Sequence, residues 1–273
     1  MHRYIVRTLT TLGLLLVLAC LPAAGQTTRR SAPAAGGWTF DVAPYLWLPA
    51  LDGDITVRGR TAPVDVSIGE FVETLFADFQ FAALGRVEAR RGPFVFTFDL
   101  LYLSLEQEDT ISLGVNTEVD FSQLIIEFGV GYQLGDWRLG RRPWPRLSME
   151  VLGGGRYVNL DPELEITVTG PPGIRVDVDQ PVDWLEPFVG ARLRLAVSRP
   201  LAFVVRGDAG GFGVGSDLTW NLVATLQYQT SPKVTLAVGY RLLDIDYDSG
   251  SGRDRFVYDV LTHGPILGIA FRL

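Results

Sequence analysis

The sequence predicts an all-β protein, a transmembrane antiparallel up-and-down β-barrel of about ten strands, with eight and twelve as the alternative counts. Three observations lead to this class. Apolar and polar residues alternate with a period of two along most of the chain after residue 37, as they do in strands. One face carries the bulky apolar and aromatic residues, whereas the other carries Gly, Ala, Arg, Glu and Asp. Short turns also alternate with longer connections, as in outer-membrane barrels.

The first 25 residues have the pattern of a cleaved secretory signal peptide. A basic start precedes the apolar run at residues 9–21, which is too short to span a membrane comfortably. Small residues precede a cleavage site after Gly25, and a buried N-terminal helix is the alternative interpretation. Residues 26–37 then form a flexible leader, and residues 38–273 form the barrel domain. The predicted location is the cell outer membrane.

Charge and cysteine content restrict the mature chain further. The formal net charge is −7 and becomes −9 once Arg3 and Arg7 leave with the signal peptide, so a nucleic acid is not an expected partner. The single cysteine, Cys20, lies in the signal peptide, so we expect no disulfide in the mature protein.

The alternation defines ten predicted strands, each long enough to cross a bilayer when tilted. They are residues 38–48, 79–90, 94–103, 119–134, 146–160, 186–197, 201–209, 217–229, 234–242 and 264–273. A soluble sandwich also alternates, with its apolar face inward. Here the small and charged residues suit a narrow polar interior, so the apolar face is expected to meet lipid. Such a sheet must close on itself, because unpaired backbone groups in hydrocarbon are costly.

The connections support the count of ten. Five long connections, at residues 49–78, 105–118, 161–185, 210–216 and 245–255, alternate with four shorter ones. This order places both termini in the periplasm and the long connections outside. A twelve-strand barrel results if residues 55–59 and 63–67 also enter the wall. Within residues 66–76, four apolar residues recur at helical spacing and predict a short helix in the first outside loop, with an ordered turn as the alternative.

Several segments resemble a widespread and largely uncharacterised family of proteobacterial outer-membrane β-barrel proteins. They are WLEPFVGARLRL, RGDAGGFGVGSDLTW, GYRLLDIDY and HGPILGIAFRL in the C-terminal third, with FDVAPYLWLPALDGDITVRG and EARRGPFVFTFDLLYLSL earlier. The resemblance covers nearly all of the mature chain and implies a barrel, but no activity. The last residues also resemble the assembly signal of such barrels, with Gly268, Phe271 and Leu273 at the marked positions. This implies contact between the C-terminal strand and the barrel assembly machinery, although Leu273 departs from the usual terminal Phe.

The inward face is expected to carry a charged set that nearly balances. Its members are Arg86, Glu88, Arg90, Asp99, Glu127, Glu150, Arg156, Arg192, Arg194, Arg206, Asp208 and Arg241. One interpretation is a lumen filled by ion pairs, because eight strands leave space that side chains just fill and ten leave only a narrow passage. The alternative is a polar pore or small-ligand pocket lined by the same groups.

Evidence for an enzyme is thin. His263 is the only histidine left after signal cleavage. It could act as a general base next to Asp259 or next to a carboxylate of a loop. The alternative interpretation is a histidine at the rim of the barrel with no catalytic role. The glycine-rich residues 210–216 precede a strand rather than the helix that a phosphate loop needs, and the acidic residues 244–254 lack the terminal Glu of an EF-hand. We therefore expect no catalytic residue, metal or cofactor.

These observations predict a barrel with a structural or interaction role at the cell surface and with outer-membrane lipid as its surroundings. A narrow pore, with a small polar solute as partner, is the alternative. A membrane-embedded hydrolase is the least favoured function.

Overall fold

The computed structural model describes residues 37–69, 71–72, 82–111, 115–168 and 174–273. The predicted signal peptide and the leader up to residue 36 lie outside these ranges. The barrel itself is formed within the unit Trp38–Leu273.

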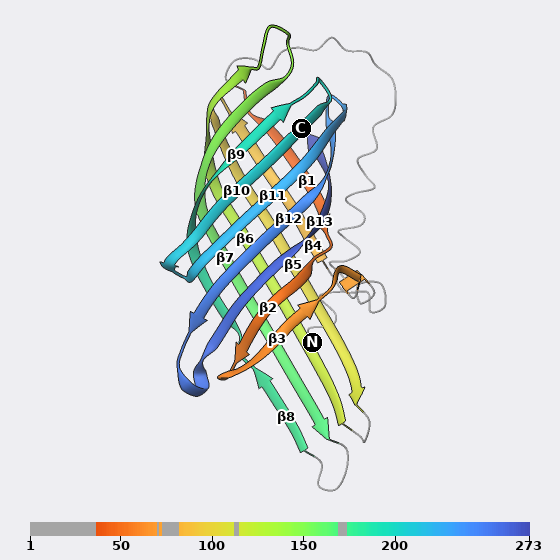
Figure 1. The fold of residues 1–273 in the computed structure, drawn as a ribbon, viewed down its shortest axis with the longest axis vertical. Helices are drawn as coiled ribbons and strands as arrows, with labels where there is room; N and C mark the ends of the chain where they lie inside the picture. The colour runs from red at the N-terminus through yellow and green to blue at the C-terminus, as the bar shows by residue number, and fades with distance from the viewer. Residues whose placement is uncertain (1–36, 70, 73–81, 112–114, 169–173) are drawn as a thin grey trace. The chain divides into compact units, whose positions relative to one another are not determined.

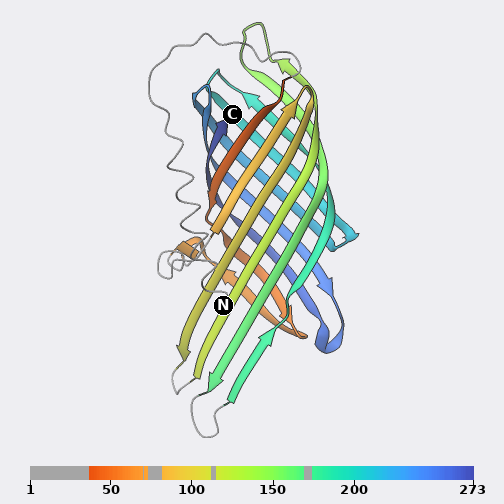
Figure 2. The ribbon, with the colours of Figure 1, turned by 180° about the vertical axis from the view of Figure 1, so that it is seen from behind.

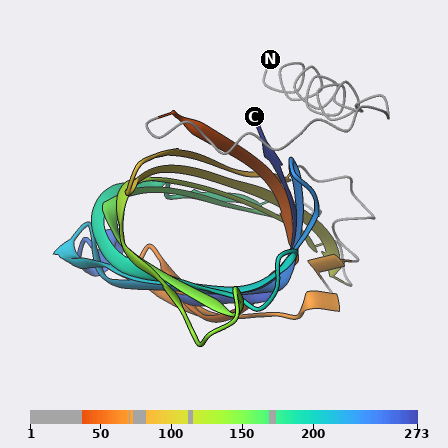
Figure 3. The same ribbon diagram turned by 90° about the horizontal axis from the view of Figure 1, so that it is seen from above.

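Ten antiparallel strands close into a ring, which confirms the predicted fold class (Figures 1, 2 and 3). They are β1 (Thr39–Trp47), β4 (Ala82–Arg91), β5 (Phe94–Ile111), β6 (Val115–Arg138), β7 (Arg146–Val168), β9 (Val182–Ala196), β10 (Leu201–Val214), β11 (Ser216–Ser231), β12 (Val234–Ser249) and β13 (Phe256–Arg272). Consecutive members of this set pair with one another, and β13 pairs with β1 to close the ring. Closure satisfies the backbone polar groups of both edge strands.

Three further strands extend the sheet without adding to the ring. They are β2 (Ala50–Val57), β3 (Arg60–Val66) and β8 (Ile174–Asp179). After a break at Leu48 and Pro49, β2 continues along β13 where β1 stops, and β3 pairs with β2. The alternative count of twelve is therefore wrong, because the ring closes between β1 and β13.

Three of the predicted outside connections, residues 105–118, 161–185 and 210–216, are largely strand. In the third, β10 ends at Val214 and β11 begins at Ser216. β5 and β6 continue to Ile111 and from Val115, and β7 continues to Val168, where β8 pairs with it. The predicted helix in the first outside loop is represented by a single turn. Phe71 N donates to Ser67 O at 3.0 Å, whereas residues 70 and 73–81 lie outside the described part.

Only short helical segments occur among the described residues, namely that turn and the 3-10 helix η1 (Gly252–Asp254). No helix in the described part of the chain has the length and apolar character needed to span a membrane.

We call the end of the barrel that holds the start of β1, the end of β13 and the four shorter turns the terminal end. The other is the hairpin end. Outward side chains on the terminal half are apolar and exposed, and we call this surface the lipid-facing belt. It includes Phe40, Val42, Leu46, Phe96, Phe98, Phe128, Val130, Leu193, Phe203, Leu226, Leu236, Val238 and Leu267. Near the terminal end, aromatic rings pack together, as at Phe94 and Tyr132, whose centroids are 5.3 Å apart. Such rings are typical of an interfacial girdle.

The outward face changes character toward the hairpin end. Asp246 lies opposite Asp259, which lies opposite Asp54, so three carboxylates face outward in one row across β12, β13 and β2. In the neighbouring row Leu261 lies between Asp244 and Asp52. Charged groups are costly on the lipid face near the bilayer midplane but not at its edge. On these three strands the lipid-facing belt therefore ends on the terminal side of this acidic surface.

Candidate functional site: the layered lumen

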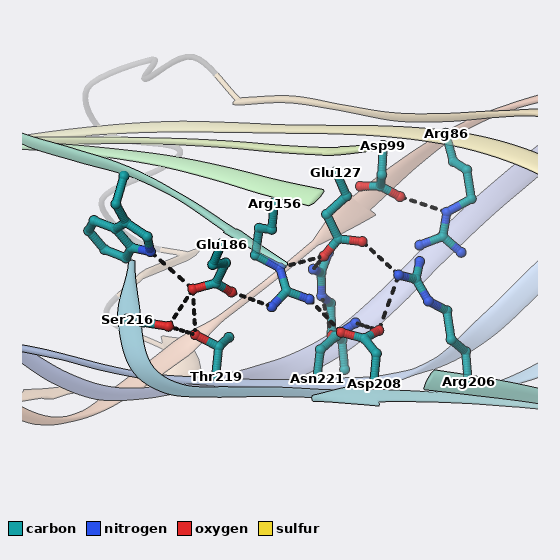
Figure 4. A network of polar contacts seen from close by, with 12 residues as sticks. Arg86, Asp99, Glu127, Arg156, Glu186, Arg206, Asp208, Ser216, Thr219 and Asn221 are labelled. Carbon is teal, nitrogen blue, oxygen red and sulfur yellow. Dashed lines mark hydrogen bonds and ion pairs between the residues drawn. The ribbon is translucent and has the colours of Figure 1, made fainter. Parts of the chain in front are cut away.

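Arg156 is the centre of a buried network in the middle of the lumen (Figure 4). Its side chain, on β7, is 0% exposed. It donates from Nε to Glu127 on β6 at 3.0 Å, from Nη1 to Glu186 on β9 at 2.8 Å, and from Nη2 to Asp208 on β10. The planar guanidinium can serve several acceptors at once, which is why arginine suits a buried charged site.

Glu186 extends the network toward the hairpin end. Its Oε2 atom accepts hydrogen bonds from Trp184 Nε1 and Thr219 Oγ1, both at 3.0 Å, and from Ser216 Oγ. Glu186 was not among the predicted lumen residues, although its position, an even number of residues before Arg192, places it on the same inward face. Its partners Trp184, Ser216 and Thr219 are uncharged, so the pattern of charged residues in the sequence could not identify them.

A second branch links Arg156 to the far wall through Asp208. The Asp208 carboxylate contacts Arg206 Nη2 at 3.1 Å and accepts from Asn221 Nδ2 at 3.0 Å. The Asn221 oxygen in turn accepts from Arg241 Nε at 3.1 Å. Arg206 also reaches Glu127 at 2.8 Å, so each buried carboxylate of this branch has a cationic partner.

The branch ends on β1, β4 and β5. Arg241 Nη1 donates to the Tyr45 hydroxyl at 3.3 Å, and that hydroxyl donates to Asp99 at 2.7 Å. Asp99 also accepts from Arg86 Nε at 2.6 Å. The mid-lumen network thus connects strands around much of the ring.

Closer to the terminal end, four side chains form a separate closed set that we call the charge ring. Arg90 contacts Glu88 at 2.8 Å and Glu150 at 2.6 Å. Arg192 contacts Glu150 at 2.8 Å and also pairs with Glu88. These residues come from β4, β7 and β9, so the charge ring crosses the lumen.

Eleven of the twelve predicted lumen residues therefore lie in one of these two ion-pair sets. The exception is Arg194, whose Nη1 donates to the neutral Gln227 oxygen at 2.6 Å.

Toward the hairpin end the lumen is filled by apolar side chains, which we call the apolar plug. Its buried members are Trp47, Leu51, Phe71, Leu101, Leu103, Ile125, Val158, Leu160, Trp184, Leu243, Ile245, Phe256, Tyr258 and Val260, none more than 7% exposed. Against them pack partly buried residues such as Tyr247, whose ring stacks on Trp184 at a centroid distance of 4.0 Å. This apolar layer was not predicted from the sequence.

Hydrogen bonds join the connections at the hairpin end, beyond the apolar plug. Arg58 N, in the β2–β3 turn, donates to the Gln180 side chain at 2.8 Å. Gln180 Nε2 donates to Asp254 O at 3.2 Å, and Gly59 N donates to Arg255 O at 3.0 Å. The β2–β3 hairpin is thereby tied to the β12–β13 connection and to the segment before β9.

His263 faces outward and has two side-chain partners. Its Nε2 lies 2.8 Å from Asp52 Oδ2, and its Nδ1 lies 2.6 Å from the Tyr240 hydroxyl. The expected neighbour Asp259 is not one of these partners, whereas Asp52 does belong to a predicted outside connection. The contacts tie β2 to β12 and β13 near the break that follows β1. Among the described residues, no group of three or more His, Cys, Asp or Glu side chains could hold a metal ion.

Gly268, Phe271 and Leu273 lie on the closing strand or directly after it. Gly268 is opposite Tyr45 of β1, Phe271 is opposite Val42, and Leu273 N donates to Phe40 O at 2.9 Å. The structure thus places all three at the β1–β13 closure, and their role in assembly remains a prediction.

The acidic surface leads to a pH-dependent prediction. Burial and the charge of Asp259 raise the pKa of Asp246, so the ionised carboxylate lowers the free energy of unfolding at neutral pH. We expect Asp246→Asn to stabilise the barrel at neutral pH. The gain should vanish below about pH 3, where the wild-type carboxyl is protonated in both states. Urea unfolding at both pH values measures this.

Asp248 is the matched control, because a hydrogen bond from Arg255 lowers the pKa of its carboxyl. Its ionised form therefore stabilises the fold above the ordinary aspartate pKa, and that contribution is lost on acidification. Asp248→Asn should lower stability at neutral pH, opposite in sign to Asp246→Asn. Equal signs for both variants would contradict the electrostatic explanation.

Comparison with known proteins identifies solved barrels of similar architecture. The outer membrane protease OmpT from Escherichia coli matches with a TM-score of 0.49 and 6% identity, covering 89% of this chain and 99% of that chain. Neisserial surface protein A matches with a TM-score of 0.32 and 12% identity over 86% and 98% of the two chains. Ail of Yersinia pestis, in complex with the heparin analogue sucrose octasulfate, gives 0.33 and 11% over 87% and 99%.

Likenesses at these scores and identities support no conclusion about the chain's activity. No protein-family model matches the sequence, and no curated protein matches it either. The resemblance to an uncharacterised barrel family therefore stays a prediction.

Proposed function

We propose that this chain is an outer-membrane barrel closed to free solute flow, with a structural or interaction role at the cell surface. The observation that carries the proposal is the apolar plug, whose buried side chains fill the lumen on the hairpin side of the charged layers. A bare ion moved from water into an idealised medium of low dielectric constant faces a cost on the order of 20 kcal/mol. An ion therefore has no favourable route through the apolar plug.

The proposed location rests on the two faces of the wall. The lipid-facing belt would sit in the bilayer, with the terminal end toward the periplasm and the acidic hairpin end in water outside. Outer-membrane lipid is then the obligatory partner of the belt. The β1–β13 closure would be the site at which the barrel assembly machinery acts on the last strand.

Planar-bilayer recording tests the closed lumen. We expect no single-channel steps from the wild-type barrel, with a general porin as the positive control and heat-modifiable migration on gels as evidence of folding. Clear steps that decrease in Arg192→Ala would instead support the alternative, a narrow pore for small polar solutes. In that case the proposal of a closed barrel fails.

The hydrolase remains the least favoured function. His263 contacts a phenol and a carboxylate, and no serine hydroxyl among the described residues is hydrogen-bonded to it. Incubation with lipid esters is the direct test, and turnover that is lost in His263→Ala would reverse this ranking.

A further inference from the structure

The charges of the lumen do not cancel within the described residues. Between the terminal end and the apolar plug, seven inward arginines face six inward carboxylates, those of Glu88, Asp99, Glu127, Glu150, Glu186 and Asp208. Six of the arginines form an ion pair. The remaining one, Arg194, has the neutral amide oxygen of Gln227 as its one hydrogen-bonded acceptor within the described part of the chain. The pairs Arg272–Asp41 and Arg146–Asp136 at the terminal end are each balanced within themselves.

Neighbouring arginines make the electrostatic potential around Arg194 more positive. Arg90, Arg272 and Arg192 are the cations that act on it most strongly, and Glu150 is the carboxylate that opposes them. Glu150 is already bound by Arg90 and Arg192 within the charge ring. The electrostatic field at Arg194 therefore favours an added anion.

Arg194 is also accessible, unlike the arginines of the mid-lumen network. It is exposed, whereas Arg156 is fully buried and Arg206 and Arg241 are 5% and 2% exposed. A guanidinium has five N–H donors in a planar fork, and the bond to Gln227 uses one of them. The free donors match the oxygens of a carboxylate or a phosphate group.

We propose that Arg194 is the centre of an anion-binding site open at the terminal end of the barrel, specific for a carboxylate or phosphate group. The charge ring forms the inner wall of this site, and the apolar plug lies beyond it. The site is therefore a dead end that binds a ligand rather than a passage. The predicted leader, with two arginines and no acidic residue, does not have the charge to occupy it.

Titration of the detergent-refolded full barrel at low ionic strength tests the proposal, because it does not depend on the proposed location or on conductance. Inorganic phosphate and acetate are the probes for the two chemistries, and a short-chain phosphatidylglycerol tests a lipid headgroup as the source. We expect saturable binding of at least one probe by calorimetry. Arg194→Gln should weaken that binding at least tenfold.

A second variant distinguishes loss of the site from a general disturbance. Gln227→Glu keeps Arg194 but supplies a carboxylate where the neutral amide now accepts its hydrogen bond, so it should also weaken binding at least tenfold. The control Arg255→Gln removes an arginine at the hairpin end, where it pairs with Asp248, and should leave affinity unchanged. No saturable binding of any probe, or equal affinity in wild type and Gln227→Glu, overturns the proposal.

Discussion

Replacement of Arg156 by methionine is expected to lower the free energy of unfolding by about 3–5 kcal/mol, the cost of removing one partner from a buried ion pair. The variant leaves the carboxylates of Glu127, Glu186 and Asp208 without the cation that joins them, in a region where their side chains are at most 4% exposed. Methionine fills a similar volume, so the loss reports on charge rather than on a cavity. Urea unfolding in lipid vesicles, followed by tryptophan fluorescence, measures it.

Two comparisons make this result specific. Arg146→Met removes an exposed pair with Asp136, whose side chains are both 38% exposed, and should change stability little because water screens such pairs. Arg156→Met combined with Glu186→Gln and Asp208→Asn should recover part of the loss, since fewer uncompensated charges remain. A wild-type-like Arg156→Met barrel would show that the network does not hold the lumen together.

The polarity of the two faces of the wall changes along the length of a strand, as β12 shows. On β12, the inward face changes from Gly239 and Arg241 to Leu243 and Ile245, while the outward face changes from Val238 to Asp244 and Asp246. The terminal half therefore has the polarity of a membrane barrel, apolar outside and charged inside. On β12 and β13 the hairpin half has the polarity of a water-soluble barrel, with apolar residues inside. On β9 and β11 exposed apolar residues continue toward the hairpin end, as at Leu185 and Leu218.

This inversion explains which parts of the fold could be predicted from the sequence. Strict alternation, as in Phe94, Phe96 and Phe98 against Thr97 and Asp99, gave the strands of the terminal half and the direction of their side chains.

Where the polarity inverts, apolar residues such as Leu101 and Leu103 occupy the face expected to be polar, and the predicted strands stop too early. The apolar plug was missed for the same reason.

The alternation of strand residues predicted most of the charged side chains that face the lumen. It could not predict which of them pair with one another. Glu88 and Arg90 are near in sequence and on one face, yet each also bonds a residue on a strand that is not its neighbour, Arg192 and Glu150 respectively. Such contacts depend on barrel closure and on the stagger of the strands, which no local pattern encodes. The leftover cation, Arg194, is identifiable only after every other pair has been assigned.

Two leucines on the outward face of β13 provide the sharpest test of which part of the wall lies in lipid. Leu267, 52% exposed, lies between Val238 and Leu46 within the lipid-facing belt. Arginine at this position would put a charge among acyl chains, so Leu267→Arg should cost about 2–4 kcal/mol of unfolding free energy in vesicles if it lies near the bilayer midplane. Urea unfolding of the refolded variant measures the loss.

Leu261 is the matched control, six positions earlier on the same face of the same strand, between Asp244 and Asp52. Arginine there lies beside carboxylates that repel one another, so Leu261→Arg should leave stability unchanged or raise it. The two substitutions are chemically identical and differ only in height along the barrel. An equal loss at both positions would mean that the acidic surface also lies in lipid. If neither variant lost stability, the belt at Leu267 would not lie in lipid. The assignment of the apolar outward face to the membrane would then be wrong.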